Sequence, residues 1–254
     1  MLMRSLSCAA ALLFGIVGSR DAWALPLPRG ALWIAVRSCV LSQATMGVPF
    51  PCLEVQPGSS TGRGFAVLRS PDSSTHVVVM PTARIPGIES PELLQEGAGA
   101  YWRAALDARR HVVEGAGGRV PLSAIGLAVN SAETRSQDQL HIHADCIRPN
   151  VIARLQADAA QDTSGWMALH GTLEGDRYLV RTLSRREIEG GNVFATVAAM
   201  PGGEHDLSGA KVLLVDAGDG DRFVLAVTRS SRHSIESLLD GSCKAALRHL
   251  RPPS

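Results

Sequence analysis

Hydrophobic residues in this sequence occur in short runs and in helically spaced stripes that alternate along the chain. Short apolar runs bounded by turn-forming residues predict strands, and apolar residues three and four positions apart predict helices. The predicted strands cover residues 65–68, 76–80, 125–130, 139–144, 177–181, 211–215 and 222–228. The predicted helices cover residues 29–43, a region opening at 90–93, 101–113, 151–158, 184–200 and 235–250. Paired strands interleaved with helices in this order are typical of an antiparallel α+β fold with flanking helices.

Local sequence features predict where several of these elements begin and end. The turn-rich residues 69–75 join two apolar runs into a hairpin. Ser184, followed three residues later by Glu187, is a capping box that opens the helix running towards Met200. Residues 216–221 join a second hairpin and are rich in Asp. They lack the spacing and closing Glu of an EF-hand calcium loop, so a plain turn is predicted.

The segment 139–144 alternates polar and apolar residues and carries the best candidate chemistry. In an extended strand, successive side chains point to opposite faces. Gln139, His141 and His143 then share one face, and the three apolar residues between and after them turn to the core. Imidazole is the side chain whose unperturbed pKa allows nucleophile, base and acid roles near neutral pH. This strand therefore predicts a site built on His141 and His143.

Two other interpretations of the histidine pair stay open at the level of spacing alone. The pair can be two partly exposed strand histidines without a role, or part of a zinc site if a third ligand comes from elsewhere. The remaining six histidines show no ligand spacing and receive no role. They are His76, His111, His170, His205, His233 and His249.

Composition bounds the class of protein. The chain has 254 residues, 45% hydrophobic and 19% charged, which suits a globular protein of one large domain or two small ones. Arg4, an apolar run at 8–18 and Ala-Trp-Ala at 22–24 predict a secretory signal over residues 1–24, with an uncleaved signal-anchor as the alternative. After cleavage, Lys plus Arg falls from 25 to 23 and Asp plus Glu from 24 to 23. A neutral chain lacks the basic footprint of a nucleic-acid-binding protein.

Four cysteines remain after the predicted cleavage, and no Cys-x-x-Cys motif is present. An even number in an exported chain predicts two disulfides with three possible connectivities. The favoured pairing joins Cys39 to Cys52 and Cys146 to Cys243, which ties the C-terminus to the end of the histidine strand. Buried free thiols are the alternative.

Longer motifs add a family resemblance. The segment 130–149 resembles the histidine triad superfamily, whose signature is His-x-His-x-His with apolar residues between. More closely, nearly the whole chain resembles the bacterial CDP-diacylglycerol pyrophosphatase family. The likeness rests on Val-Met-Pro-Thr-Ala-Arg-Ile-Pro-Gly-Ile-Glu-Ser-Pro at 79–91, Leu-Ala-Val-Asn-Ser at 127–131, and His-Ile-His through Cys-Ile-Arg-Pro at 141–149. The four cysteines also occupy positions where that family has them.

The resemblance implies roles for the motif residues. The middle triad histidine matches His141, which becomes a nucleophile that forms a covalent nucleotidyl intermediate. The third matches His143, which hydrogen-bonds phosphate oxygens as charge shifts. The first triad position holds Gln139 instead of His, a departure expected to affect rate and substrate preference more than reaction type. Gln139 can still donate and accept hydrogen bonds to the substrate.

Further phosphate contacts follow with less direct support from the motif. Superfamily resemblance carries Asn130 and Ser136 to phosphate-oxygen contacts. Arg84 and Arg148 lie near the motif in sequence and can pair with phosphate, with solvated surface or a structural ion pair as the alternative. No metal and no cofactor is implied.

The implied substrate is CDP-diacylglycerol, hydrolysed to CMP and phosphatidate in phospholipid metabolism. The expected location is the periplasmic side of a bacterial inner membrane, in contact with the membrane surface. Residues 25–150 are expected to form a histidine triad-like catalytic half and 151–254 to complete the domain, in a monomer with two similar halves. Two alternatives remain: an enzyme of the same fold acting on a soluble nucleotide, and a noncatalytic metal-binding periplasmic protein.

Overall fold

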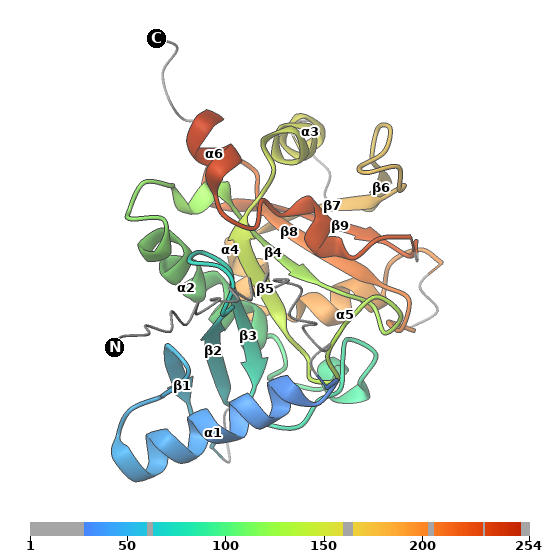
Figure 1. Cartoon of the computed structure of the whole chain (residues 1–254). Coiled ribbons are helices and arrows are strands. Elements are labelled where there is room, and N and C mark those ends of the chain that lie inside the picture. The colour runs from blue at the N-terminus through green and yellow to red at the C-terminus, as the bar shows by residue number, and fades with distance from the viewer. Residues whose placement is uncertain (1–27, 60–62, 160–164, 203–205, 231, 250–254) are drawn as a thin grey trace, which may run out of the picture.

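The computed structural model describes residues 28–59, 63–159, 165–202, 206–230 and 232–249 (Figure 1). The predicted signal peptide and its cleavage site lie outside the described residues. Among the helices of these described ranges, none has the length and apolar character needed to cross a membrane.

The strands of the described residues form one nine-stranded sheet in which every neighbouring pair is antiparallel. The order across the sheet is β1-β2-β3-β5-β4-β8-β9-β7-β6 (Figure 1). The strands are β1 Glu54–Gln56, β2 Phe65–Arg69, β3 Val77–Pro81, β4 Ile125–Val129, β5 Ile142–Cys146, β6 Met167–Ala168, β7 Leu179–Ser184, β8 Lys211–Asp216 and β9 Arg222–Thr228. The pairing of β4 with β8 joins the first half of the chain to the second in a single sheet.

Helices flank this sheet, which confirms the predicted α+β class. The α-helices are α1 Ala31–Met46, α2 Ala100–Gly115, α3 Pro149–Ala159, α4 Arg185–Gly190, α5 Val193–Ala198 and α6 Lys244–His249. Three short 3₁₀ helices are η1 Pro91–Leu94, η2 Leu122–Ala124 and η3 Ile235–Leu238. The first, second and third α-helices and both hairpins lie close to where the hydrophobic pattern predicts them.

One face of the sheet carries the main core. Leu127 on β4 and Ile142 on β5 belong to one buried cluster with Trp102 of α2 and Phe194 of α5. The spacing of apolar residues along α2 turns one side of this helix to β3 and β5. Each such buried side chain contributes about 1.5–3 kcal/mol of transfer free energy. This face therefore fixes the orientation of β5 and leaves its other side chains for the opposite face.

The opposite face is covered in two separate pieces. On one side α1 packs Val36 against Val78 and Met80 of β3. On the other, a cluster that includes Leu155 of α3 and Leu238 of η3 packs on β8 and β9. The histidine-bearing face of β5 lies between these two covers.

The predicted helix over residues 184–200 is wrong in its length. The capping box at Ser184 and Glu187 is present and opens α4, but the helix ends at Gly190. Asn192 then caps a second helix, α5, by accepting a hydrogen bond from the backbone N–H of Phe194. A side chain at Gly191 would collide with the Glu187 carbonyl oxygen, 2.4 Å from the Cβ position, so the break needs glycine.

The predicted helix over residues 235–250 is also wrong. It divides into η3 and α6, and the residues between them turn back to the end of β5. The Asp240 backbone N–H donates to the Cys146 carbonyl at 2.7 Å, and the Arg148 N–H donates to the Leu238 carbonyl at 3.1 Å. These long-range contacts outweigh the helical spacing of the apolar residues.

Three smaller differences concern strand ends. β5 starts at Ile142, and residues 139–141 precede it, because the Leu140 N–H donates to the Ile85 carbonyl instead of to a strand. β7 starts at Leu179, two residues later than predicted. The turn after β8 is the plain turn predicted: Asp216 Oδ1 accepts the backbone N–H groups of Gly218 and Gly220.

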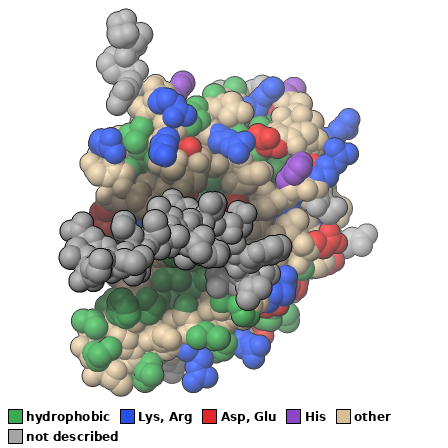
Figure 2. Space-filling view, in the orientation of Figure 1, with side chains coloured by type: hydrophobic (Ala, Val, Ile, Leu, Met, Phe, Trp, Pro, Cys, Tyr) green, Lys and Arg blue, Asp and Glu red, His purple; other side chains and the backbone are tan. Residues whose placement is uncertain are grey.

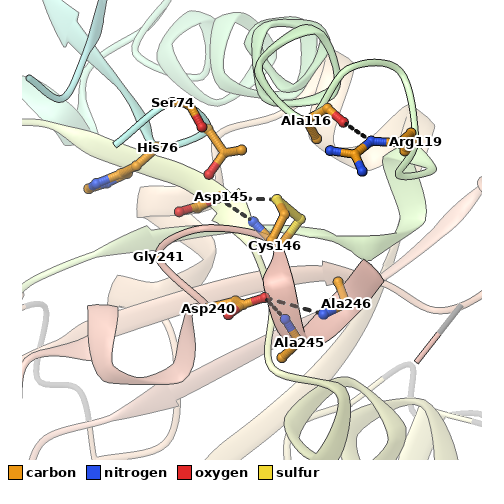
Figure 3. Close-up of a disulfide and its surroundings, with 12 residues drawn as sticks. Ser74, His76, Ala116, Arg119, Asp145, Cys146, Asp240, Gly241, Ala245 and Ala246 are labelled. Atoms are coloured by element: carbon orange, nitrogen blue, oxygen red, sulfur yellow. Dashed lines mark hydrogen bonds between the residues drawn. A yellow bond between two sulfur atoms is a disulfide. The ribbon is translucent and has the colours of Figure 1, made fainter. Parts of the chain in front are cut away.

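Both predicted disulfides are confirmed. Cys39 of α1 is bonded to Cys52, and Cys146 at the end of β5 is bonded to Cys243. Figure 3 shows the second disulfide with Asp145 beside it, and Asp240 accepting the N–H groups of Ala245 and Ala246 at the start of α6. The C-terminal segment is thus attached to β5 by a covalent bond and by backbone hydrogen bonds.

Candidate active site

His141, directly before β5, and His143, on β5, lie together on the side of the sheet that the main core leaves free. Their ring centroids are 4.6 Å apart, whereas Leu140, Ile142 and Ala144 belong to the main core on the other side. This confirms the predicted alternation for His141 and His143. Both imidazoles are buried, with exposed fractions of 5% and 4%, so the interpretation as partly exposed strand histidines is wrong.

The His141 ring is held in a single tautomer. Its Nδ1 lies 2.7 Å from the carbonyl oxygen of Gln139, and a carbonyl only accepts, so Nδ1 carries the hydrogen. The Nε2 atom is then unprotonated, and no other described residue forms a hydrogen bond with it. Burial, and next the neighbouring His143, lower the pKa of His141 to about 4. The ring is therefore neutral near pH 7, with one nitrogen lone pair available for attack.

The Gln139 side chain is bonded to the Pro81–Ala83 segment and not to the two histidine rings. It is fully buried, and its Nε2 donates to the carbonyl oxygens of Pro81 at 3.0 Å and Ala83 at 2.9 Å. The residue acts on the site through its backbone carbonyl, which orients His141.

A third histidine, His76, completes the cluster, and the sequence analysis assigned it no role. It comes directly before β3, and its Nε2 lies 2.9 Å from Nδ1 of His143, with the rings stacked at 5.1 Å. Burial, and then His143, lower the pKa of His76 to about 4. The sequence held only part of the signal: in the predicted hairpin, residue 76 shares a face with Val78, but the pairing of β3 with the histidine strand is known only from the fold.

Glu236 is the second group that sequence reasoning missed. Its Oε1 lies 3.1 Å from Nε2 of His143 and 2.5 Å from Nδ2 of Asn130. Burial by itself raises the pKa of Glu236, but the hydrogen bonds from His143 and Asn130 outweigh it and hold the pKa well below the usual range. His143 therefore has His76 on one ring nitrogen and an ionised carboxylate on the other.

Several contacts hold Glu236 in place. Asn130 Oδ1 accepts the backbone N–H of Ile235 at 2.9 Å, so Asn130 contacts both η3 and the Glu236 carboxylate. The buried Lys211 donates from Nζ to the carbonyl of His233 at 2.5 Å and lies 3.6 Å from the Asp176 carboxylate. These contacts fix the segment that carries Glu236 to β4 and β8. Further along the chain, the Cys146–Cys243 disulfide attaches Cys243 to the end of β5.

A cavity of about 200 Å³ opens beside these rings. Its polar lining includes all three histidines, Glu236, Ser136 and Gln137. The apolar lining comes from α1 and from the β2–β3 hairpin, through Leu32, Leu68 and Val78. Since one water occupies about 30 Å³ in the liquid, the cavity admits a group of several heavy atoms. Its wall is apolar on one side and bears the reactive nitrogens on the other.

Of the remaining predicted phosphate ligands, some lie in the cavity lining and others lie outside it. Ser136 is exposed and lines the cavity. Arg84 is exposed and is not part of the cavity lining. Arg148 is also outside the lining, where it pairs with Glu174 at 3.0 Å and donates to the Leu239 carbonyl. Within the described residues, the cavity contains imidazoles and no guanidinium.

The geometry of the cluster bears on the metal-binding alternative. His76, His143 and Glu236 follow one another in a chain of hydrogen bonds and do not converge on one point. Among the described residues, the potential ligand atoms that do converge belong to Asp145, Cys146 and Cys243, and the two sulfurs are bonded to each other. The histidine cluster provides a neutral imidazole beside two further imidazoles and a carboxylate, and an imidazole in this state can act as a nucleophile.

Comparison with known proteins specifies the class: a hydrolase acting on phosphoric anhydrides. Residues 28–247 match the sequence model of the CDP-diacylglycerol pyrophosphatase family, and the chain belongs to that family. It is 35% identical over 226 residues to a protein of Yersinia pestis described as CDP-diacylglycerol pyrophosphatase, with 87% of this chain and 86% of that protein covered. The family resemblance of the motifs is thereby confirmed.

Proposed function

We propose that this chain hydrolyses the pyrophosphate bond of CDP-diacylglycerol to CMP and phosphatidate, with Nε2 of His141 as the nucleophile. The observation that carries the proposal is the state of His141. Its Nδ1–H is bound to the Gln139 carbonyl, its Nε2 is free, and the ring is neutral in a cavity shared with two more imidazoles. A neutral nucleophile is suited to a substrate whose phosphate oxygens repel anions.

In the first step, the Nε2 lone pair forms a bond to the phosphorus of the CMP group. The bond from that phosphorus to the bridging oxygen breaks, and its electron pair leaves with phosphatidate. The imidazole becomes positively charged while it carries the nucleotide. The Gln139 carbonyl, already 2.7 Å from Nδ1, stabilises that charge without reorganisation.

In the second step, a water oxygen bonds to the same phosphorus and the N–P bond breaks. Its electron pair returns to Nε2, CMP is released and His141 is neutral again. The proton from water passes to the His76–His143 pair. If His143 donates from Nε2 to the Glu236 carboxylate, its Nδ1 accepts from His76 Nε2–H, which leaves Nδ1 of His76 as the base.

Isotope labelling in H₂¹⁸O tests this proposal directly. Incubation of the chain with CDP-diacylglycerol should give CMP and phosphatidate, with the label in CMP. Label in phosphatidate would show attack at the other phosphorus and contradict the assignment of the nucleotidyl group to His141. Equal turnover of CDP-choline would favour an enzyme for soluble nucleotides, and absence of any turnover would contradict the function.

The likeness to histidine triad enzymes is part of the same proposal. Residues 25–150 are the catalytic half, and 151–254 are a second, similar half within one chain. The central β4–β8 pairing supports this division, since each half then contributes one hairpin to the middle of the sheet. A monomer is expected on size-exclusion chromatography with light scattering, and an obligate dimer would contradict the idea.

The chain acts on the outer side of a bacterial inner membrane under this proposal. The two disulfides support export, because such bonds persist in oxidising compartments such as the periplasm. The signal-like N-terminus agrees with that address. Fractionation of producing cells should place the chain with the periplasm or the inner membrane, and recovery of the reduced chain from cytosol would contradict it.

Replacement of Glu236 with Gln is expected to lower kcat by about 100-fold, the low end of the contribution of general acid–base catalysis, because Glu236 acts through His143. Gln keeps the size of the side chain but removes the charge that stabilises His143 during proton transfer. The matched control is Glu174→Gln, because Glu174 is also paired and its side chain is 39% exposed against 38% for Glu236. Steady-state kinetics measure both, and equal rates in the two variants would contradict the role of Glu236.

The pH dependence of kcat/KM follows from the low pKa of His141. Because the ring attacks in its neutral form, activity should persist below the usual histidine range and fall by half near its pKa of about 4. Half-loss near pH 6.5, the unperturbed value, would contradict a buried neutral nucleophile.

The free energy of unfolding should also depend on pH, and denaturant unfolding at each pH measures it. His76 and His141 bind protons more readily when unfolded, so the free energy of unfolding decreases as pH falls from about 6.5 towards 4.

A further inference from the structure

The outer side of α1 presents large apolar side chains to solvent. Ile34, Leu41 and Met46 have exposed fractions of 64–65%, and Phe50 in the following loop reaches 73%. Figure 2 shows hydrophobic side chains gathered over the lower part of the molecule, where α1 lies in Figure 1. The Cys39–Cys52 disulfide holds residues 47–53 against the helix, and the exposed apolar side chains of the helix and of this loop are together called the α1 face. Exposed apolar side chains gathered in this way mark an interaction site.

The polar residues of the α1 face bond to the helix itself. Ser38 Oγ donates to the Ile34 carbonyl at 3.0 Å, and Thr45 Oγ1 donates to the Leu41 carbonyl at 2.8 Å. A hydroxyl that donates to the backbone carbonyl four residues earlier does not need water as its hydrogen-bond acceptor. The α1 face can therefore leave water at a lower cost than a surface with unpaired polar side chains.

Charge on this segment has one sign. Residues 28–53 contain Arg29 and Arg37 and no Asp or Glu. Arg29 pairs with Asp138, whereas Arg37 lies exposed on α1 itself. An apolar surface with a positive charge and no carboxylates complements the apolar boundary and anionic headgroups of a lipid bilayer.

The α1 face also adjoins the active site. Ala31 and Leu32, in the first turn of α1, line the cavity that contains His141 and His143. We propose that the α1 face docks on the bilayer surface, with α1 lying in the interface, and that the lipid substrate enters the cavity along the first turn of this helix. Because α1 is apolar on its packed side, through Val36, and on its outer side, through Ile34 and Leu41, it suits a helix placed between the sheet and a bilayer. The inference rests on the proposed lipid substrate.

Tryptophan quenching by brominated lipids tests the docking in the full chain. Leu41→Trp and Phe50→Trp place reporters on the α1 face, and Leu122→Trp is the control, since Leu122 is 46% exposed on η2. With phosphatidylglycerol–phosphatidylcholine vesicles, the first two reporters should be quenched beyond the wild-type signal and the third should not. Absence of extra quenching at both positions, or equal quenching at Leu122→Trp, would overturn the proposal.

Activity measurements separate docking from chemistry. The double variant Ile34→Asp/Leu41→Asp should hydrolyse CDP-diacylglycerol in vesicles at least about tenfold more slowly, because two apolar contacts with the bilayer are lost. It should retain its rate on a short-chain, monomerically dissolved CDP-diacylglycerol, which also shows that it folds. Unchanged activity on vesicles would overturn the docking while leaving the proposed function intact. A dimer that the double variant dissociates would assign the α1 face to a second copy and also overturn it.

Discussion

His141→Ala is expected to lower kcat for CDP-diacylglycerol by at least about three orders of magnitude, because removal of a covalent nucleophile abolishes both chemical steps. His143 cannot replace it, since its two ring nitrogens are already engaged by His76 and Glu236. Initial rates of CMP release measure the loss. A second variant, His141→Asn, retains an N–H for the Gln139 carbonyl and should be equally inactive, which separates lost chemistry from lost folding.

His111→Ala is the matched control for this experiment. The side chain of His111 is also largely buried, with 12% exposed, and its ring nitrogens pair with Glu54 and Glu114. It is not part of the cavity lining. Its replacement should leave kcat within about twofold, as for changes away from the reacting groups. Wild-type activity in His141→Ala, or an equal loss in His111→Ala, would contradict the assignment of the nucleophile.

Loss of the Cys146–Cys243 disulfide is expected to give the largest stability change. The bond closes a loop of 97 residues, and chain entropy predicts a contribution of about 4–5 kcal/mol to the free energy of unfolding. The double variant Cys146→Ala/Cys243→Ala should therefore unfold at lower denaturant. It should also lose activity before global unfolding, because residues 239–243 attach the Glu236 segment to the end of β5.

Cys39→Ala/Cys52→Ala is the comparison for that variant. Its loop spans 13 residues, for which the same relation gives about 3 kcal/mol. Urea unfolding followed by tryptophan fluorescence compares the stability losses of the two variants. CMP release measured at each urea concentration shows whether activity is lost before unfolding. A smaller stability loss for the Cys146–Cys243 variant, or full activity up to its unfolding transition, would contradict the role assigned to this disulfide.

The local pattern of the sequence predicted the part of the site that lies within one strand. Alternation over residues 139–144 assigned His141 and His143 to one face, because a strand has a fixed period of two. The carbonyl of Gln139 that orients His141 was not predicted, because the sequence analysis gave Gln139 a side-chain role. An even number of cysteines in an exported chain predicted two disulfides. The favoured pairing among the three possible ones is the one that the structure contains.

The rest of the site comes from contacts between distant residues, which periodicity does not encode. Glu236 was hidden in a predicted helix, and that helix breaks because residues 238–240 bond to the backbone at the end of β5. His76 lies 67 residues from His143 in sequence, and only the pairing of β3 with β5 brings the rings together. Gln139 faced the site in the predicted strand, yet its amide binds two carbonyls of the Pro81–Ala83 segment.

The covalent intermediate is the most direct test of the account. Rapid acid-free quenching of the enzyme during turnover of CDP-diacylglycerol, followed by proteolysis and mass spectrometry, should find a cytidylyl group on the peptide that contains His141, and none on that peptide from His141→Asn. A cytidylyl group on another residue, or full turnover with no modified peptide under conditions that preserve phosphohistidine standards, would contradict an attack by the free nitrogen of His141.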